Sequence, residues 1–302
     1  MSLCLNTEIE IREQEPLHLH SSFKIGGPAK YALFPKNREE LLSALSCVTV
    51  QGHPYRVIGN GSNMLFDDKG FDGVIIFTKR LNESEYLPTE EGAVIRVGCG
   101  KSLAELSGEA GKKMGLTGLE FACGIPGTVG GAVFMNAGAY GGQMSDIVRE
   151  TEYFDITDGK IKCVTGDGHR FDYRHSLFAE HPEYVILSTT LYLKKGDPEE
   201  ILASMNKNKT ARREKQPSEP SAGSTFKRPG GGLYAGKLIE DAGLKGYTVG
   251  GAVVSQKHAG FTVNTGGATC ADVLAVMKHT RDTVKERFGV TLESEIIYLP
   301  YN

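Results

Sequence analysis

The segment from Phe121 to Gly142 constrains the fold of this chain more than any other, because seven of its residues are glycine. A chain uses glycine this densely where its backbone must approach another group closely or take a positive φ. The segment has almost no charge, so its backbone N–H groups must supply most of its polar contacts. Such a turn, opening a short helix, suits a phosphate or pyrophosphate. A buried turn of small residues is an equally good interpretation.

A second glycine-rich turn, Gly59-Asn-Gly-Ser-Asn63, follows an expected strand. It fails the Rossmann pattern, because Met64-Leu-Phe66 stands where a third glycine and a helix are needed. It also lacks the Gly-Lys-Ser/Thr of a P-loop. It is therefore a plain turn or a phosphate-binding loop of another class. Two such segments in consecutive sub-domains could hold one extended dinucleotide between them.

The length, net charge and cysteine spacing of the chain exclude several classes of protein. Its 302 residues allow two or three sub-domains, and a formal net charge of −3 provides no basic field to attract nucleic acid. The six cysteines form no CxxC pair or metal-ligand spacing, which predicts reduced thiols in the cytoplasm. The first 16 residues do not resemble a signal peptide, and no apolar run is long enough to span a membrane.

Periodicity and capping signals predict an α+β chain. A stretch rich in basic residues, proline and serine, residues 207–223, predicts a linker or active-site loop. We expect a helix capped by Asn37, with Glu40 as its box partner, a helix from the Ser102–Glu105 capping box to Met114, and helices at 198–208, 234–242 and 271–288. Strands are expected at 30–34, 55–58, 74–77, 94–97, 152–156, 161–164, 184–193, 252–255, 261–264 and 290–299, with a hairpin turn at Asp158-Gly159.

Several polar residues are candidates for chemistry. Arg174 lies in an expected turn among aromatic residues, where it either stacks on the surface or binds a carboxylate. Ser224 lacks a Gly-x-Ser-x-Gly setting, so by itself it suggests a cap or turn hydroxyl. Glu293 and Glu295 share one face of the expected last strand, either as solvent-facing residues or as half-buried proton donors. His258 has no metal-like partner, which favours a structural or substrate-contact role.

Eight motifs occur in order along the chain: Ser22-Phe-Lys-Ile-Gly-Gly-Pro-Ala29, Gly59-Asn-Gly-Ser-Asn-Met-Leu-Phe66, Gly124-Ile-Pro-Gly-Thr-Val-Gly-Gly131, Asn136-Ala-Gly-Ala-Tyr-Gly141, Tyr173-Arg-His-Ser-Leu-Phe178, Ala222-Gly-Ser-Thr-Phe-Lys-Arg-Pro229, Ala235-Gly-Lys-Leu-Ile-Glu240 and Leu292-Glu-Ser-Glu-Ile296. Together they closely resemble the UDP-N-acetylenolpyruvoylglucosamine reductase (MurB) family of peptidoglycan synthesis. The interval between Arg174 and Ser224 is too short for the Tyr-bearing insertion of the longer family type, so the chain resembles the shorter type.

The resemblance implies an α+β fold: a two-sub-domain FAD-binding fold of the vanillyl-alcohol oxidase (PCMH) type and a C-terminal α+β substrate-binding domain. We expect sub-domains at 1–78 and 79–208 and the substrate domain at 209–302, and leave open whether the last strand packs back on the FAD domain. FAD would bind non-covalently. Its expected contacts are Gly59, Asn60, Gly61, Ser62, Asn63, Met64, Gly124, Ile125, Pro126, Gly127, Val129, Gly130, Gly131, Asn136, Gly138, Ala139 and Tyr140.

The resemblance also implies the reaction. NADPH would reduce FAD, and the flavin would pass hydride to C3 of UDP-N-acetylglucosamine enolpyruvate, giving UDP-N-acetylmuramate. Matching positions make Arg174 and Glu295 the groups that stabilise the negative charge, and Ser224 the proton donor to C2, with Lys227 as a neighbour. The expected substrate-binding residues are Lys215, Lys227, Arg228 and Gln256. A monomer is expected, with no nucleic-acid partner and no membrane insertion.

Two other functions stay open at this point. One is an oxidase of the same FAD fold, which would often tether its flavin to a histidine. The other is a non-catalytic module that binds a UDP-sugar or a flavin. Purified protein distinguishes them by its flavin content, by the fate of the flavin on acid precipitation, and by NADPH consumption.

Overall fold

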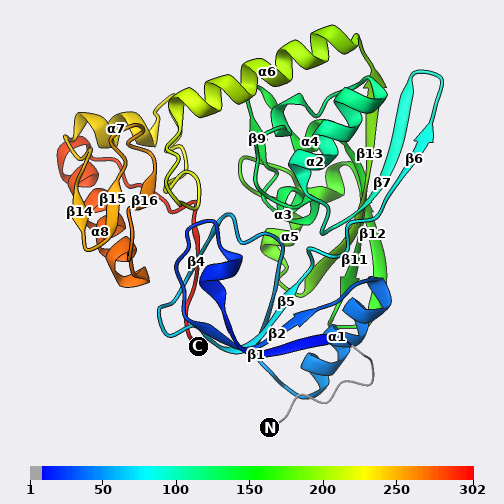
Figure 1. Cartoon of the computed structure of the whole chain (residues 1–302), viewed down its shortest axis with the longest axis horizontal. Coiled ribbons are helices and arrows are strands. Elements are labelled where there is room, and N and C mark those ends of the chain that lie inside the picture. The colour runs from blue at the N-terminus through cyan, green and yellow to red at the C-terminus, as the bar shows by residue number, and fades with distance from the viewer. Residues whose placement is uncertain (1–8) are drawn as a thin grey trace. The chain divides into compact units, whose positions relative to one another are not determined.

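The computed structural model describes residues 9–302, which fold into two compact units (Figure 1). The first unit comprises the residues up to Arg12 together with Tyr31–Asn60 and Val74–Ala211. The second comprises Glu13–Lys30, Gly61–Gly73 and Arg212–Asn302.

The largest sheet lies in the first unit and has six strands, in the order β12-β11-β13-β7-β6 with β8 also paired to β13. All its pairings are antiparallel. The expected hairpin is confirmed, because β11 and β12 pair from Asp155 and Lys160 outward, and Gly159 takes a φ of +67° in the turn. The strand bounds are β6 Ser84–Pro88, β7 Gly92–Gly98, β8 Leu116–Thr117, β11 Val148–Asp155, β12 Lys160–Thr165 and β13 Tyr184–Lys195.

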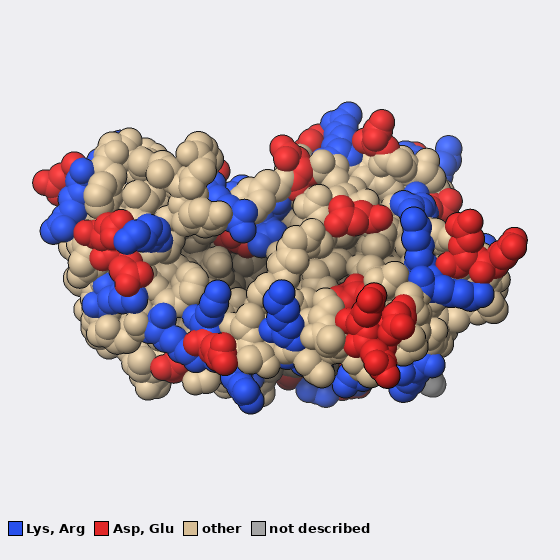
Figure 2. Space-filling model, turned by 90° about the horizontal axis from the view of Figure 1, so that it is seen from above, with Lys and Arg blue, Asp and Glu red and all other residues tan. Residues whose placement is uncertain are grey.

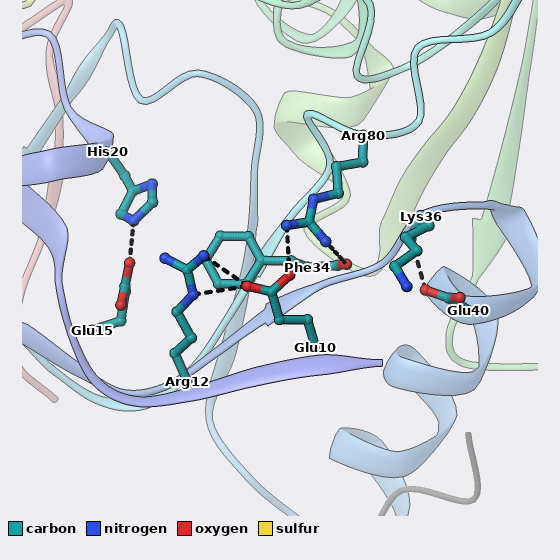
Figure 3. A network of polar contacts seen from close by, with 8 residues as sticks. All are labelled: Glu10, Arg12, Glu15, His20, Phe34, Lys36, Glu40 and Arg80. Atoms are coloured by element: carbon teal, nitrogen blue, oxygen red, sulfur yellow. Dashed lines mark hydrogen bonds and ion pairs between the residues drawn. The ribbon is translucent and has the colours of Figure 1, made fainter. Parts of the chain in front are cut away.

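A smaller sheet follows the order β1-β2-β5-β3, with β1 at Glu10–Pro16, β2 at Pro28–Phe34, β5 at Phe71–Phe77 and β3 at Tyr55–Ile58. Strands β3 and β5 run parallel, and helix α1, Arg38–Val50, lies between β2 and β3 in the chain. The predicted cap of α1 is confirmed. The Asn37 side chain accepts the Glu40 N–H, and the Lys36 N–H donates to the Glu40 carboxylate at 2.8 Å (Figure 3).

An ion-pair network ties β1 to its neighbours in the first unit. The Glu10 carboxylate accepts hydrogen bonds from Arg80 at 2.6 Å and Arg12 at 2.7 Å (Figure 3). The guanidinium groups of Arg12 and Arg80 lie 4.6 and 5.5 Å from the centre of the Phe34 ring. The hydrogen bond from Arg80, and then that from Arg12, lowers the pKa of Glu10.

Short helices complete the first unit. Ser102 caps α2, Leu103–Gly108, by accepting the Glu105 N–H, and a π-helical turn, η2 at Glu109–Lys113, continues it. Gly115 then ends the segment with a φ of +62°. The other elements are η3 Glu120–Ala122, α3 Val129–Phe134, β9 Gly138–Ala139, β10 Gly142–Gln143, α4 Met144–Ile147, η4 Gly166–His169 and α5 Leu177–Glu180.

Helix α6 is longer than predicted. It spans Pro198–Lys215, so the expectation of a linker or loop is wrong for residues 207–215. This part is rich in good helix formers, and the basic residues Arg212, Arg213 and Lys215 suit the negative end of the helix dipole. The irregular chain begins only after Lys215.

The second unit contains a three-stranded antiparallel sheet in the order β14-β15-β16 (Figure 1). The strands are β14 Thr248–Val249, β15 Ala252–Val254 and β16 Thr262–Asn264. Helices α7, Ala235–Asp241, and α8, Cys270–Phe288, pack in the same hydrophobic core. The Asp68 carboxylate accepts the N–H groups of Cys270 and Ala271, which satisfies two donors at the start of α8.

The last strand is much shorter than predicted. Strand β17 covers only Ile297–Leu299 and pairs in parallel with β4, Met64–Phe66. The prediction that Glu293 and Glu295 belong to this strand is therefore wrong. Ser294 instead makes an isolated bridge with Phe226, and residues 295 and 296 lie outside any strand. Strand β4 also confirms that no helix follows the turn at residues 59–63.

None of the helices in residues 9–302 is both long enough and apolar enough to cross a bilayer.

Candidate active site

The glycine-rich segment of the first unit forms a short helix followed by a tight hairpin. Thr128 caps α3 by accepting the Gly131 N–H at 3.4 Å. The N–H groups of Val129 and Gly130 donate to the carbonyls of Lys101 and Cys99. Among the hydrogen bonds found in residues 9–302, none uses the N–H groups of Gly127 and Thr128. Two backbone donors at the start of α3 are therefore available to a ligand.

The first two residues of the second predicted cradle, Gly59 and Asn60, belong to the first unit and lie against the segment that leads into α3. A Cβ at Gly59 would lie 2.2 Å from the Thr128 hydroxyl oxygen, so only glycine permits this approach. The Asn60 side-chain amide donates to the carbonyl of Pro126. The turn that starts at Gly59 is thus packed on the segment that leads into α3.

Arg174 is held by the same glycine-rich segment. Its guanidinium donates to the Gly138 carbonyl at 3.3 Å and lies 5.1 Å from the centre of the Tyr173 ring. Its backbone has a φ of +55°, a conformation that costs an L-residue about 1–2 kcal/mol. Strain of this kind persists only where surrounding contacts enforce it, and it is common at functional sites.

Asn136 makes the contacts that hold the left-handed backbone of Arg174, a role that the sequence did not indicate. Its side chain is buried, donates to the Asp172 carbonyl at 3.1 Å and accepts the Ser145 N–H at 2.9 Å. Nearby, the Ser176 hydroxyl donates to the Phe134 carbonyl at 2.7 Å. Asn136, predicted as a flavin contact, therefore fixes the turn that contains Arg174.

In the second unit, the structure places Ser224 and Glu295 on two segments that are paired with each other. The residue after Ser224 is Thr225, whose carbonyl accepts the Glu295 N–H at 3.0 Å. The Thr225 N–H donates to the Gly260 carbonyl at 2.8 Å, and its buried hydroxyl accepts the Thr262 N–H at 2.7 Å. Thr225 is thus the anchor of this region. Sequence reasoning missed it, because its partners are far away in the chain.

The two glutamates that the sequence could not distinguish have different surroundings. The Glu293 side chain is 76% exposed, and its carboxylate lies 3.9 Å from the Lys227 Nζ. Glu295 is half-buried, and its carbonyl accepts a hydrogen bond from the Asn63 side chain at 3.0 Å. The Asn63 carbonyl also accepts the Ile297 N–H. Asn63, another predicted flavin contact, therefore fixes the backbone on both sides of residue 296.

The predicted substrate-binding residues all belong to the second unit. Lys215 ends α6 and is exposed. The Arg228 guanidinium lies 5.3 Å from the centre of the Tyr234 ring. The Gln256 side chain covers Gly246, where a Cβ would lie 2.1 Å from its amide nitrogen. Figure 2 shows basic and acidic side chains interspersed on the face that it presents.

His258 lies in the loop that holds Thr225. Its Nδ1 accepts the Gly260 N–H at 3.1 Å, and burial lowers the pKa of the imidazole. A neutral ring with its proton on Nε2 satisfies this bond. A structural role for His258, one of the two that the sequence left open beside substrate contact, agrees with this geometry.

Two family models match the chain. The FAD binding domain matches residues 29–165, and the UDP-N-acetylenolpyruvoylglucosamine reductase C-terminal domain matches residues 216–299. The reductase of Lachnoclostridium phytofermentans is 46% identical over 284 residues, which cover 93% of this chain and 90% of the relative. The chain belongs to the UDP-N-acetylenolpyruvoylglucosamine reductase family. The reductase of Caldicellulosiruptor saccharolyticus is also 46% identical, over 96% of this chain and 92% of the relative.

A solved structure of this reductase family agrees over nearly the whole chain. The UDP-N-acetylenolpyruvylglucosamine reductase (MurB) of Thermus caldophilus is 36% identical, covers 97% of this chain and 99% of its own, and has a TM-score of 0.79. This match and the FAD binding domain confirm the predicted family and fold class. The domain boundaries at residues 78 and 208 and the roles of the site residues stay predictions.

Proposed function

We propose that this chain reduces UDP-N-acetylglucosamine enolpyruvate to UDP-N-acetylmuramate, with NADPH as hydride donor and non-covalent FAD as carrier, in peptidoglycan precursor synthesis. The observation that supports this most is the pairing of the Ser224 and Glu295 segments through Thr225 in a chain of the reductase family. This pairing places a hydroxyl and a carboxyl group, both predicted to act on the substrate, on neighbouring backbone.

The residues of the glycine-rich turns fit a flavin dinucleotide. The unused N–H groups of Gly127 and Thr128 suit the pyrophosphate, and Gly59 allows its turn to pack closely on Thr128, beside these donors. Asn60, Asn63 and Asn136 would contribute through the backbone that they hold in place. When bound, FAD accepts hydride from NADPH and passes it to the substrate.

The residues of the chain would handle charge and the proton. Addition of hydride to C3 leaves negative charge on C2 and on the adjoining carboxylate. The Arg174 guanidinium stabilises this charge electrostatically, and Glu295, when protonated, does so by donating a hydrogen bond. The Ser224 hydroxyl gives its proton to C2. A hydroxyl is a weak acid, so its placement must be precise, and the buried Thr225 anchor provides that.

We assign binding of the nucleotide part of the substrate to basic and amide side chains of the second unit. Lys215, Lys227 and Arg228 offer positive charge to the diphosphate, and Gln256 offers an amide. We further propose that the enzyme acts as a monomer in the cytoplasm, without a nucleic-acid partner.

The test separates the two half-reactions. Purified protein should be yellow, should release FAD on acid precipitation, and should oxidise NADPH rapidly only when the enolpyruvyl substrate is present. Ser224→Ala should leave flavin content and flavin reduction by NADPH unchanged, while flavin reoxidation by the substrate slows about 10²–10⁴-fold. Ser221→Ala, in the same segment, is the matched control and should react normally.

Three results would contradict the proposal. Colourless protein that takes up no FAD would exclude the flavin. Yellow protein that retains its flavin after acid precipitation would favour the oxidase. If NADPH reduces the flavin but the enolpyruvyl compound does not reoxidise it, this compound is not the substrate.

A further inference from the structure

The first unit contains a cavity of about 390 Å³ beside the glycine-rich segment. Its size is within the range of small-molecule sites. It is bordered by the β9–β10 hairpin, by strands β11 and β13 and by helix α6. Its lining includes the side chains of Phe121, Tyr140, Arg149, Tyr192, Lys194 and Asn208.

Three aromatic residues line this cavity. Phe121 is 5% exposed and packs under Gly142, where a Cβ would come within 2.8 Å of its ring. Tyr192 lies on β13, and Tyr140 is at the tip of the hairpin. Tyr140 and Gly141 have φ values of +52° and +86°, a pattern that favours asparagine or glycine at the first position. A tyrosine at this strained position, 46% exposed, is a surface on which a planar group can stack.

Two cations line the same cavity and have no acidic partner. Arg149 and Lys194 lie on the paired strands β11 and β13. The Arg149 guanidinium lies 5.5 Å from the centre of the Tyr192 ring. No ion pair within residues 9–302 involves either side chain, whereas the neighbouring Arg96 of β7 has one with Glu85. Two cations without an ion pair among the described residues are therefore available to a ligand, in a lining that also holds Glu120 and Asp146.

The acidic residues at the cavity do not neutralise that charge through direct contact. One Glu120 oxygen accepts the Thr117 hydroxyl at 2.6 Å, and the other accepts the Gly118 N–H at 2.8 Å. Asp146 accepts the Gln143 N–H at 2.9 Å as part of the cap of α4. Both carboxylates are thus bound to donors of their own loops.

We propose that this cavity binds a small aromatic anion of the size of a nucleoside monophosphate. The base would stack on the ring of Tyr192 or Tyr140, and the phosphate would meet Arg149 and Lys194. Of the residues proposed above to hold flavin, only Tyr140 lines the cavity. The rest of the lining is distinct from the proposed flavin contacts, so binding in this cavity can be tested separately from the reductase reaction.

Isothermal titration calorimetry on the flavin-containing protein tests this inference. AMP and UMP are titrated separately, with adenosine and inorganic phosphate as probes of the ring and of the charge. We expect at least one mononucleotide to bind saturably, and each partial probe to bind at least about tenfold more weakly. The double variant Arg149→Gln/Lys194→Gln and the single variant Tyr192→Leu should each weaken mononucleotide binding by about tenfold or more.

The matched control is Arg96→Gln, which removes an exposed cation of the same sheet outside the cavity and should leave the affinity unchanged. Equal affinity in wild type and both cavity variants would place the nucleotide in another site and overturn the inference. So would the absence of saturable binding, or phosphate binding as tightly as the mononucleotides. Flavin absorbance and a melting curve confirm that each variant is folded, and reductase activity does not enter this assay.

Discussion

The turn that contains Arg174 in the first unit and the segment pair that contains Ser224 and Glu295 in the second unit are built in different ways. Arg174 has a left-handed backbone, held by its contact with Gly138 and by the buried amide of Asn136. Ser224 and Glu295 belong to segments joined by backbone hydrogen bonds, with the buried Thr225 hydroxyl behind them. Neither Ser224 nor Glu295 has a positive φ.

This difference shows two physical routes to a fixed side chain. In the first unit, the buried Asn136 amide holds the strained backbone of Arg174. The direction of the Arg174 side chain is thus fixed at the expense of conformational free energy. In the second unit, backbone pairing sets two residues at once and needs no strain. Removing the side-chain function of Ser224 or Glu295 should therefore affect chemistry alone, whereas replacing Arg174 by glycine should lower turnover and also relieve backbone strain.

The largest effect is expected from Glu295→Gln. If the paired segments place Glu295 for catalysis, the turnover number should fall about 10²–10³-fold, as for the loss of a group that stabilises transition-state charge. Glu293→Gln is the matched control, because its side chain is 76% exposed, and it should retain turnover close to that of wild type. Steady-state NADPH oxidation measures both variants. Equal losses would show that the difference in side-chain exposure does not decide which glutamate acts.

Thr225→Val tests the anchor itself. The substitution leaves the buried Thr262 N–H without its 2.7 Å acceptor, which should lower the free energy of unfolding by about 1–3 kcal/mol. Thr225→Ser keeps the hydroxyl and loses one methyl group, so it should lose only about 1 kcal/mol. Urea denaturation gives both values. A valine variant as stable as wild type would mean that backbone pairing suffices without the hydroxyl.

Arg174→Gly tests the strained region. Glycine relieves about 1–2 kcal/mol of left-handed strain, but its greater freedom in the unfolded chain offsets about 0.5–1 kcal/mol of this. Stability should therefore stay within about 1 kcal/mol of wild type, while turnover falls at least about tenfold through the loss of the guanidinium. Arg170→Gly is the control, because Arg170 has a φ of +49° and no proposed catalytic role. It should retain turnover.

The smallest effect is expected from pH at the β11–β12 turn of the first unit. Hydrogen bonds from Lys162, and then from Thr157, lower the pKa of Asp155 from 3.8 to about 2. A lowered carboxyl pKa contributes stability that is present above pH 3.8 and is lost as the pH falls through about 2. Asp155→Asn should therefore flatten the dependence of the melting temperature on pH between 5 and 2. An unchanged slope would show that this ion pair does not contribute.

Local signals in the sequence were sufficient for much of the fold. Asn37 with Glu40 and Ser102 with Glu105 predicted helix starts that the structure confirms, because a cap needs only residues three apart. Asp158-Gly159 predicted a hairpin for the same reason. The order of the family motifs identified the reductase family. Local signals failed at α6 and β17, where the helix continues to Lys215 and the strand shortens to Ile297–Leu299.

The sequence by itself therefore determined the family, the fold class and the elements whose caps and turns are local. Only the tertiary structure decided how the site residues are held. Asn136 reaches Asp172, Thr225 reaches Thr262 and Glu295, and Asn63 reaches Glu295, through hydrogen bonds between residues that are distant in the chain. Strand alternation left Glu293 and Glu295 equivalent. Both backbones pair with the Ser224 segment in the folded chain, but the Glu293 side chain is 76% exposed whereas Glu295 is half-buried.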